Sequence, residues 1–540
     1  MDQALVVERS RQGTAHSRVL GRVSSVRGAQ LSAALDPGAE TMPTARMGAL
    51  VKMKTPVSTV FGEVDIVERR GDGNGHAAGI MDIDLLGEAM ATGDEDATRF
   101  QRGVSIYPLL GTPVEPAESA DIAQVYAKPS SATVRFGAIY QDPSVPAYLM
   151  IDPLLGKHFA VLGTTGSGKS CAVALVLRAI LSQQNKGHVV LIDAHNEYSR
   201  AFPDMAEVSD IRSLQLPFWL FDFEEAVGIF VRGGTASEQE SQKAILKEAI
   251  LAAKRKYSGE KMDPLAITVD TPVPYRLVDL IKSIDDSMAR LDKPDNSVPY
   301  LRLKHRLESL NDDRRFAFMF PRRLMSDNLD KIIARVMRIP VEDKPLSIID
   351  ISGVPSEVVD VVVSMLCRMI FDFALWAERD RAQPILLVCE EAHRYIPANE
   401  SLGFEATRRA MTRIAKEGRK YGVALCLVTQ RPSELSPSIL SQCGTMFALR
   451  MNNEQDQTFV ARALPDNAHR LLGVLPELRT QEALVVGEGV SVPMRVRLDT
   501  LAPERQPRSE SARFSDLWAA ENEGAAFVEE TINKWRNQIR

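Results

Sequence analysis

Short apolar segments separated by turn residues fill the first part of the chain. LGRVSSVRGAQLSAAL, ALVKMKTPVSTVFGEVDIVE and ATVRFGAIY cluster or alternate β-branched and apolar residues, and DPGAE and RGDGNGH supply turns. No long helical pattern interrupts them. Because many short strands without long helices are typical of closed β-structures, residues 19–140 are predicted to form a small β-barrel. Residues 1–18 are polar and are expected to be a flexible N-terminus.

From residue 141 the pattern changes to apolar, strand-like runs that alternate with helical segments. This alternation covers residues 141–202 and 343–500, and it predicts an α/β core built on a parallel sheet. Between these parts, residues 203–342 are rich in charge and in helical spacing, as in ESQKAILKEAILAAKRKY, and are interpreted as a helical insertion. Residues 501–540 are interpreted as a Pro/Arg/Ser-rich linker followed by one last helix.

The segment FAVLGTTGSGKSCAV, from Phe159 to Val173, carries the strongest chemical signal. An apolar strand, the loop G-x-x-x-x-G-K-S and a helical pattern follow one another, which is the context of a P-loop. Glycines let backbone N–H groups curl around phosphates, and the helix N-terminus completes an anion site. Lys169 is predicted to reach the β- and γ-phosphates of ATP, and the Ser170 hydroxyl to hold Mg²⁺. The predicted nucleotide-binding residues are Gly163, Thr164, Thr165, Gly166, Ser167, Gly168, Lys169, Ser170 and Cys171.

Two adjacent acids follow a second apolar strand. The run from Ile385 to Cys389 ends in Glu390 and Glu391. One carboxylate at a strand tip can hold the Mg²⁺ shell through water, and its neighbour can polarise the attacking water. Glu390 is therefore assigned to the metal and Glu391 to the catalytic base. The alternative, a solvated acidic turn, is disfavoured by the P-loop upstream.

Acids also follow the strand from His188 to Ile192, which is expected to lie beside the P-loop strand. Asp193 and Glu197 are secondary candidates for Mg²⁺ binding or for positioning water. For both of them a solvated turn at the end of a strand is an open alternative.

Two further side chains are candidates for contact with the γ-phosphate. Gln430 ends the apolar strand Val423–Thr429 and is predicted to be a phosphate sensor, with a loop amide as the alternative. Arg419 follows Gly418 at the end of a predicted helix, so it lies on an exposed corner. An exposed arginine can act as a finger in a neighbour's nucleotide site. The alternative is a basic helix end that the macrodipole favours.

Composition narrows the class of protein. With 45% hydrophobic and 25% charged residues, the 540-residue chain is typical of globular proteins, and its formal charge of −6 argues against a uniformly basic nucleic-acid binder. The five cysteines show no metal-ligand spacing and are expected to be reduced. No leader-like segment begins the chain, and the apolar stretch from Val358 to Trp376 contains charges that indicate a buried amphipathic helix. A cytoplasmic location is expected.

The motifs together resemble the HerA family of hexameric DNA translocases, relatives of FtsK and of conjugation ATPases. The resemblance is carried by these strings in this order: GRVSSVRGAQL, KHFAVLGTTGSGKS, VVLIDAHNEYS, LSIIDISGVP, ILLVCEEAHRYIP and RIAKEGRKYGVALCLVTQRPSELSPSILSQC. It implies an N-terminal barrel, a RecA-like ATPase core, a helical insertion and a ring of six subunits with DNA in its pore. It also implies that Arg419 acts in trans and that Gln430 is the sensor. Lys157 stands where the family often has a nucleotide-contacting arginine, so the resemblance makes it a further nucleotide-binding candidate, although it lacks the bidentate guanidinium fork.

Two functions follow as hypotheses. The first is an ATP-driven DNA translocase or helicase that works with a separate nuclease or other effector, in DNA end processing or anti-phage defence. The second is an ATP-binding scaffold that assembles and switches an effector, with little translocation of its own. A GTPase or small-molecule kinase is disfavoured because no Asn-Lys-x-Asp string is present. The basic strings at residues 254–261 and 314–323 are pore-loop candidates, although a solvated helical face is the favoured interpretation of each.

Overall fold

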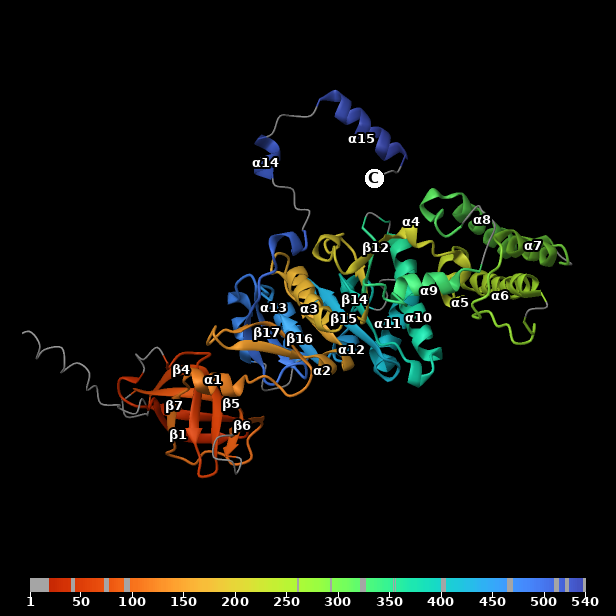
Figure 1. The fold of residues 1–540 in the computed structure, drawn as a ribbon. Coiled ribbons are helices and arrows are strands. Elements are labelled where there is room, and N and C mark those ends of the chain that lie inside the picture. The colour runs from red at the N-terminus through yellow and green to blue at the C-terminus, as the bar shows by residue number, and fades with distance from the viewer. Residues whose placement is uncertain are drawn as a thin grey trace, which may run out of the picture.

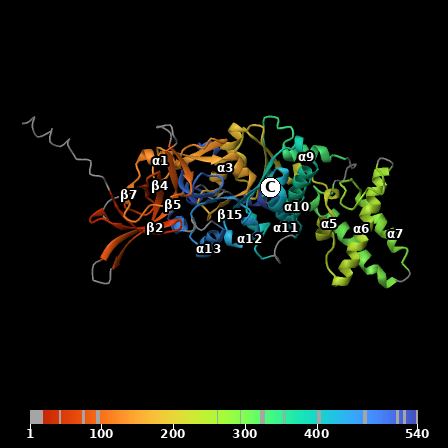
Figure 2. The same cartoon turned by 90° about the horizontal axis from the view of Figure 1, so that it is seen from below.

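A computed structural model shows a β-barrel, a central α/β domain and a helical insertion in succession along an elongated molecule (Figure 1; Figure 2). The structure describes residues 19–39, 44–71, 77–91, 98–259, 262–291, 294–320, 327–352, 354, 356–399, 405–463, 470–508, 514–519 and 524–537. The expected flexible N-terminus, residues 1–18, lies outside the described residues.

The barrel is one antiparallel sheet that closes on itself. Its strand order is β2-β1-β7-β3-β4-β5-β6, and an additional pairing of β2 with β5 closes it. Alternate residues such as Leu31, Met53 and Ile83 point inward and are buried, which explains the alternating sequence pattern. The strands are β1 (Gly21–Arg27), β2 (Gln30–Leu35), β3 (Leu50–Lys54), β4 (Ser58–Gly71), β5 (Ala77–Ala91), β6 (Thr98–Arg102) and β7 (Pro113–Pro116). The predicted N-terminal barrel is confirmed.

The central domain is built on an 11-stranded sheet of order β12-β13-β11-β14-β15-β10-β16-β17-β18-β8-β9. Its neighbours from β12 to β16 pair in parallel, as the alternating pattern predicts, and the remaining neighbours pair antiparallel. The parallel strands are β10 (Phe159–Leu162), β11 (His188–Asp193), β12 (Ala206–Asp210), β13 (Leu346–Asp350), β14 (Ile385–Cys389), β15 (Val423–Thr429) and β16 (Thr445–Ala448). The others are β8 (Thr133–Ile139), β9 (Pro146–Met150), β17 (Glu482–Gly487) and β18 (Met494–Leu498).

Two predicted domain limits differ from the structure. The segment ATVRFGAIY was assigned to the barrel, yet its strand β8 pairs with β18 and β9 in the central sheet. Likewise β12 lies inside the predicted insertion but pairs with β13 at the edge of the sheet. In both cases hydrogen-bonding partners more than 100 residues away decide to which sheet a short apolar strand belongs. The barrel strands therefore end at Pro116, and the helix α1 (Ser119–Val125) leads into the central domain.

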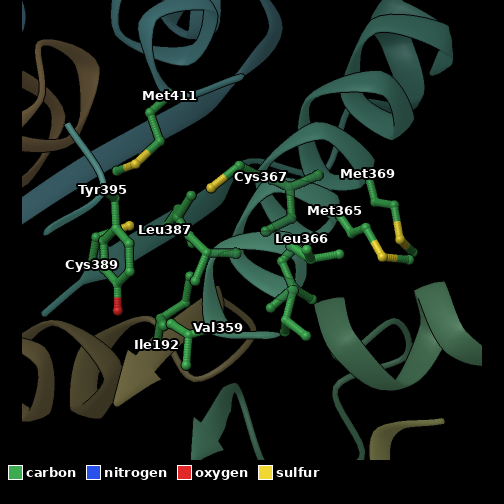
Figure 3. Packing of buried hydrophobic residues seen from close by; sticks show 14 of the residues in the cluster. Ile192, Val359, Met365, Leu366, Cys367, Met369, Leu387, Cys389, Tyr395 and Met411 are labelled. Carbon is green, nitrogen blue, oxygen red and sulfur yellow. The ribbon is translucent and has the colours of Figure 1, made fainter. Parts of the chain in front are cut away.

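Helices cover both faces of the sheet. On one face α3 (Lys169–Gln183) packs over alternate strand residues such as Val161 and Leu191. On the other face α10 (Ser356–Trp376) and α11 (Glu405–Glu417) cover Leu162, Ile192 and Leu387. Figure 3 shows Met411 of α11 beside Tyr395 and Cys389, and Cys367 of α10 facing Leu387, with Met365 and Met369 on the other side of α10. Because both faces are covered, the strands are continuous apolar runs rather than alternating ones.

The buried helix expected at Val358–Trp376 is confirmed as α10. Among the described residues, no helix is long and apolar enough to cross a membrane. All five cysteines are free; Cys171 is half-buried, and the other four are buried.

The insertion contains α5 (Phe223–Phe230), α6 (Ala236–Ser258), α7 (Leu277–Met288) and α8 (Val298–Asp312), followed by α9 (Leu329–Met337), which returns to the sheet. The pore-loop candidate at residues 254–261 begins with a lysine that is buried and hydrogen-bonded inside this domain. Lys254 is 1% exposed, and its ammonium donates to the carbonyls of Val269 and Thr271 at 2.6 and 2.7 Å. Burial lowers the pKa of Lys254 to about 8. In the second candidate Arg315 pairs with Asp313 at 2.6 Å, and residues 321–326 lie outside the described part of the chain.

A buried ion pair joins the insertion to the core. Glu225 of α5 is fully buried; it accepts from Ser364 at 2.8 Å and lies 3.1 Å from the Arg368 guanidinium, both on α10. Burial raises the pKa of Glu225, and the charge of Arg368 opposes that shift. We expect Arg368→Met to lower the free energy of unfolding by about 3–5 kcal/mol, because it leaves an unpaired buried carboxylate. Urea unfolding followed by circular dichroism measures the change.

The matched control for Arg368→Met is Arg413→Met, because Arg413 is 44% exposed and pairs with Asp372 at 3.4 Å. That change should cost less than about 1 kcal/mol. The double variant Glu225→Gln with Arg368→Met should be more stable than Arg368→Met alone, since it removes both charges. Equal stability of the two arginine variants would contradict the importance of the buried pair.

The C-terminal part differs from the predicted linker and single helix. Residues 501–508 lie against the core, where the Arg508 N–H donates to the Glu197 carbonyl at 3.0 Å. Two helices follow, α14 (Phe514–Ala519) and α15 (Ala525–Asn537). Trp518 and Trp535 are 80% and 74% exposed on them. Figure 1 shows both helices standing away from the central domain.

Candidate nucleotide-binding site

Four adjacent parallel strands end at the same edge of the sheet and bring the predicted site residues together. In the order β11-β14-β15-β10, their carboxyl ends lead to Asp193, to Glu390 and Glu391, to Gln430 and to the P-loop. Such an edge is where ligands bind in parallel α/β sheets.

The P-loop has the geometry of an anion cradle. Gly166 and Gly168 have φ values of +75° and +99°, which a residue with a Cβ atom rarely adopts. A Cβ on Gly163 would lie 2.7 Å from Ser167 Oγ and 2.9 Å from Leu449 Cβ. No side chain caps the N-terminus of α3, so its first N–H groups are available to phosphate.

Two threonines connect the P-loop to neighbouring strands. Thr164 donates from its backbone N–H and its hydroxyl to the Arg450 carbonyl, both at 3.0 Å, just beyond β16. Thr165 donates its hydroxyl to Gln430 Oε1. The buried Ser167 hydroxyl has no hydrogen-bond partner, as expected of a group that faces a ligand site. Cys171 is half-buried on α3, beside a small recess lined by Gly168, Gln481 and Gln506.

Lys169 and Ser170 point at the acidic side of the site. The Lys169 ammonium donates to the Thr164 carbonyl at 3.0 Å; burial lowers its pKa, and the charges of Glu391, Glu390 and Glu197 oppose that shift. Ser170 donates to Glu197 Oε2 at 2.5 Å. A serine hydroxyl with one or two carboxylates and phosphate oxygens is the donor set that Mg²⁺ prefers. The residues present thus fit a nucleotide with Mg²⁺.

Asp193 and Glu390 form a buried carboxyl pair. Asp193 is fully buried, and its carboxylate accepts the N–H groups of His195, Glu197 and Tyr198 at 2.9–3.2 Å. Glu390 accepts the Ala194 N–H at 3.1 Å. Burial and the neighbouring Asp193 charge raise the pKa of Glu390 well above its ordinary value. Asp193 therefore shapes the loop after β11, and Glu197 is better placed beside Ser170 for the metal.

Glu391 occupies a strained position at the tip of β14. Its φ is +51°, in the left-handed region that non-glycine residues rarely adopt outside functional sites. The side chain is 10% exposed. Its Oε1 accepts the Gln430 amide at 2.8 Å and lies 3.4 Å from His195 Nε2. Its Oε2 is buried without a hydrogen-bond partner, with His393 Nδ1 at 3.2 Å. Burial lowers the pKa of His393, which favours a neutral ring.

Arg419 and Lys157 lie at the amino ends of their strands, opposite the carboxyl ends that carry the P-loop and the acids. Arg419 belongs to the 3₁₀ turn Gly418–Tyr421 that precedes β15, and it lines an apolar cavity of about 290 Å³. Lys157 precedes β10 and pairs with Glu488 at 2.5 Å. Lys157 is therefore separated from the P-loop of its own chain by the strand β10. His158, next to it, has a structural role: it accepts the Leu425 N–H at 2.9 Å.

Three residues without a role predicted from the sequence contact site residues in the structure: His195, His393 and Arg450. The sequence does contain a signal for His195, since it lies two positions beyond the end of a parallel strand next to β14, which carries Glu391 at its tip. His393 follows Glu391 by two residues and lies 3.0 Å from Thr429 Oγ1. Arg450 acts through its backbone carbonyl, so no side-chain pattern could reveal it.

The fold and the site define a P-loop ATPase, with the loop, its lysine and a strand-end glutamate gathered at one sheet edge. Residues 134–370 match the family model described as Helicase HerA, central domain. Over this domain the chain is therefore similar to the HerA helicases, as its motifs predict.

Curated relatives agree with this placement. The DNA double-strand break repair helicase HerA of Pyrococcus furiosus is 27% identical over 400 residues, which cover 68% of this chain and 69% of that protein. The protein of the same name from Saccharolobus solfataricus is 27% identical over 398 residues, with 73% of each chain covered. Among solved structures, VirB4 of Thermoanaerobacter pseudethanolicus has a TM-score of 0.50 and 15% identity, and the match covers 70% of this chain and 99% of VirB4. That likeness shows the ATPase fold alone.

Proposed function

We propose that this protein is an ATP-driven DNA translocase or helicase that works as a ring of identical subunits. The observation that carries the proposal is the position of Arg419 relative to the P-loop. The strand β15 lies between Arg419 and Gln430, and its seven residues alone span about 23 Å. Arg419 therefore lies too far from its own P-loop to touch the γ-phosphate, and a head-to-tail neighbour is needed to supply it. Head-to-tail contacts generate rings when the rotation closes, and a hexamer is the proposed size.

ATP with Mg²⁺ is the proposed cofactor. The P-loop amides and the Lys169 ammonium would bind the phosphates, and Ser170 and Glu197 would hold the metal, with Glu390 and Asp193 close by. When bound, Mg²⁺ would supply positive charge beside the phosphate oxygens. Glu391 takes a proton from the attacking water, and Gln430 reports the state of the P-loop through Thr165. Arg419 of the neighbouring subunit stabilises the transition-state charge.

DNA is the proposed substrate because the curated relatives are named DNA repair helicases. Tracking along the phosphate backbone would be independent of sequence and sensitive to salt. A separate nuclease or other effector is the proposed protein partner, in DNA end processing or anti-phage defence. The exposed aromatic residues of α14 and α15 and the exposed Leu109 and Leu110 of the barrel support the presence of docking surfaces.

The test is steady-state ATP turnover of the purified chain with and without double-stranded DNA. We expect DNA to stimulate turnover. Lys169→Ala should abolish both basal and stimulated turnover, which excludes a contaminating ATPase. Turnover that is indifferent to DNA would contradict translocation, and it would favour a scaffold that switches an effector enzyme.

A further inference from the structure

The catalytic strand β14 lies between two strands whose ends carry polar side chains. The order β11-β14-β15 places His195, beyond β11, on one side of Glu391 and Gln430, beyond β15, on the other. Both side chains approach the same oxygen. Gln430 Nε2 donates to Glu391 Oε1 at 2.8 Å, and His195 Nε2 lies 3.4 Å from it.

The other oxygen of Glu391 has a different environment. Oε2 is buried and has no hydrogen-bond partner. His393 Nδ1 lies 3.2 Å away but is also 3.0 Å from the Thr429 hydroxyl, which accepts the Arg431 N–H at 3.0 Å. In the Nε2–H tautomer, His393 Nδ1 accepts from that hydroxyl and has no hydrogen to offer Oε2. Oε2 is thus the oxygen with free acceptor capacity.

The backbone around His195 is fixed in a way that directs its ring. The His195 N–H donates to the buried Asp193 carboxylate at 3.2 Å, and so do the N–H groups of Glu197 and Tyr198. The His195 ring itself is 49% exposed, so it is not held by core packing. The position of the His195 ring therefore depends on its backbone and on its contact with Glu391.

We propose that His195 is a positioning residue for ATP hydrolysis: together with Gln430 it fixes Oε1 of Glu391, so that Oε2 is the oxygen that accepts the proton of the attacking water. The proposal rests on the proposed function, in which Glu391 is the base. It adds that the loop after β11 holds the metal through Glu197 and orients the base through His195, two residues apart. A carboxylate held by one oxygen from both sides cannot rotate away from the water, and orientation of this kind lowers the barrier of the chemical step.

The test compares His195→Ala, His195→Gln and wild type at saturating ATP and DNA. We expect His195→Ala to lower kcat by about 10-fold or more, the size of effect that follows when a charged group loses one polar partner. Its KM and its Kd for a fluorescent ATP analogue should stay within about twofold, since the P-loop is untouched. His195→Gln keeps an N–H donor at the side-chain end and should recover most of the lost kcat. His305→Ala is the control, because that histidine is 78% exposed on α8.

Two outcomes would overturn the proposal. One is a His195→Ala variant with wild-type kcat. The other is a variant in which kcat falls together with ATP affinity and melting temperature and is not rescued by glutamine, because that pattern indicates a structural role. The variant Glu391→Gln distinguishes failure of the positioning role of His195 from failure of the proposed function. If Glu391→Gln is inactive while His195→Ala is normal, only the positioning proposal fails. If Glu391→Gln hydrolyses ATP at the wild-type rate, the assignment of the base fails first.

Discussion

Replacement of Glu391 by glutamine should reduce ATP hydrolysis about 1,000-fold while ATP still binds, since a general base contributes about 10²- to 10⁴-fold. Glutamine keeps the size of the side chain and can still accept from the Gln430 amide, but it cannot take a proton. The affinity for a fluorescent ATP analogue should therefore be unchanged or higher. Single-turnover hydrolysis, followed by release of phosphate, measures the chemical step apart from product release.

The matched control for Glu391→Gln is Glu240→Gln. This substitution is the same chemical change, and Glu240 lies on an exposed face of α6, where it pairs with Lys243. Its hydrolysis should equal that of wild type. A Glu391→Gln variant that keeps more than about a tenth of wild-type hydrolysis would contradict the assignment of the base, since a positioned base contributes more than this. In that case the buried Glu390 would become the next residue to test.

Loss of the Arg419 side chain should slow ATP hydrolysis about as much as loss of Glu391, but through the site of the neighbouring subunit. We expect Arg419→Ala to lower hydrolysis about 1,000-fold, because arginine fingers contribute about 10³- to 10⁵-fold. Binding of ATP to the isolated subunit should change little, since Arg419 lies at the far edge of the sheet from its own P-loop. Lys420→Ala, one residue along the same turn, is the control and should retain activity.

Mixed rings distinguish a finger that acts in trans from a structural arginine. Subunits with Arg419→Ala carry an intact P-loop, and subunits with Lys169→Ala carry an intact finger. Rings made by co-expressing the two chains with different tags should recover activity, because about a quarter of the interfaces in a random ring combine both intact parts. If mixed rings are as inactive as either parent, then Arg419 does not complete a neighbour's site.

The P-loop shows what local sequence can determine. Glycines with positive φ, an uncapped helix N-terminus and a lysine at fixed spacing are all properties of one contiguous segment, so GTTGSGKS predicts both its structure and its ligand. The pattern of short strands predicted the barrel, which the structure contains. The family resemblance strengthened the proposed role of Arg419 in a neighbour's site, and that residue lies at the end of the strands opposite the P-loop. Glu390 and Glu391 were predicted from one strand end in the same way.

The roles within the acidic cluster could not be predicted locally. Asp193 and Glu197 are four residues apart in one loop and looked equivalent in the sequence. In the structure the Asp193 carboxylate accepts hydrogen bonds from three backbone N–H groups, whereas the Glu197 carboxylate accepts one from the Ser170 hydroxyl. Which acid binds backbone and which faces the P-loop depends on how the loop after β11 turns against β14, and that turn is set by packing between strands.

The sequence by itself identified the candidate groups of this protein: a phosphate-binding loop, a strand-end glutamate and an exposed arginine, each encoded within a few consecutive residues. The tertiary structure alone decided which of these share a site. The strands β11 and β14 are neighbours in the sheet although they lie almost 200 residues apart in the sequence. Their pairing places Glu391 close to His195 and Gln430. Pairing between distant strands also makes β8 and β12 part of the central sheet. It also places Arg419 and Lys157 at the edge opposite the P-loop. The physical reason is that hydrogen bonds between strands are formed without regard to sequence separation, so neighbourhood in the sheet is not encoded in any local pattern.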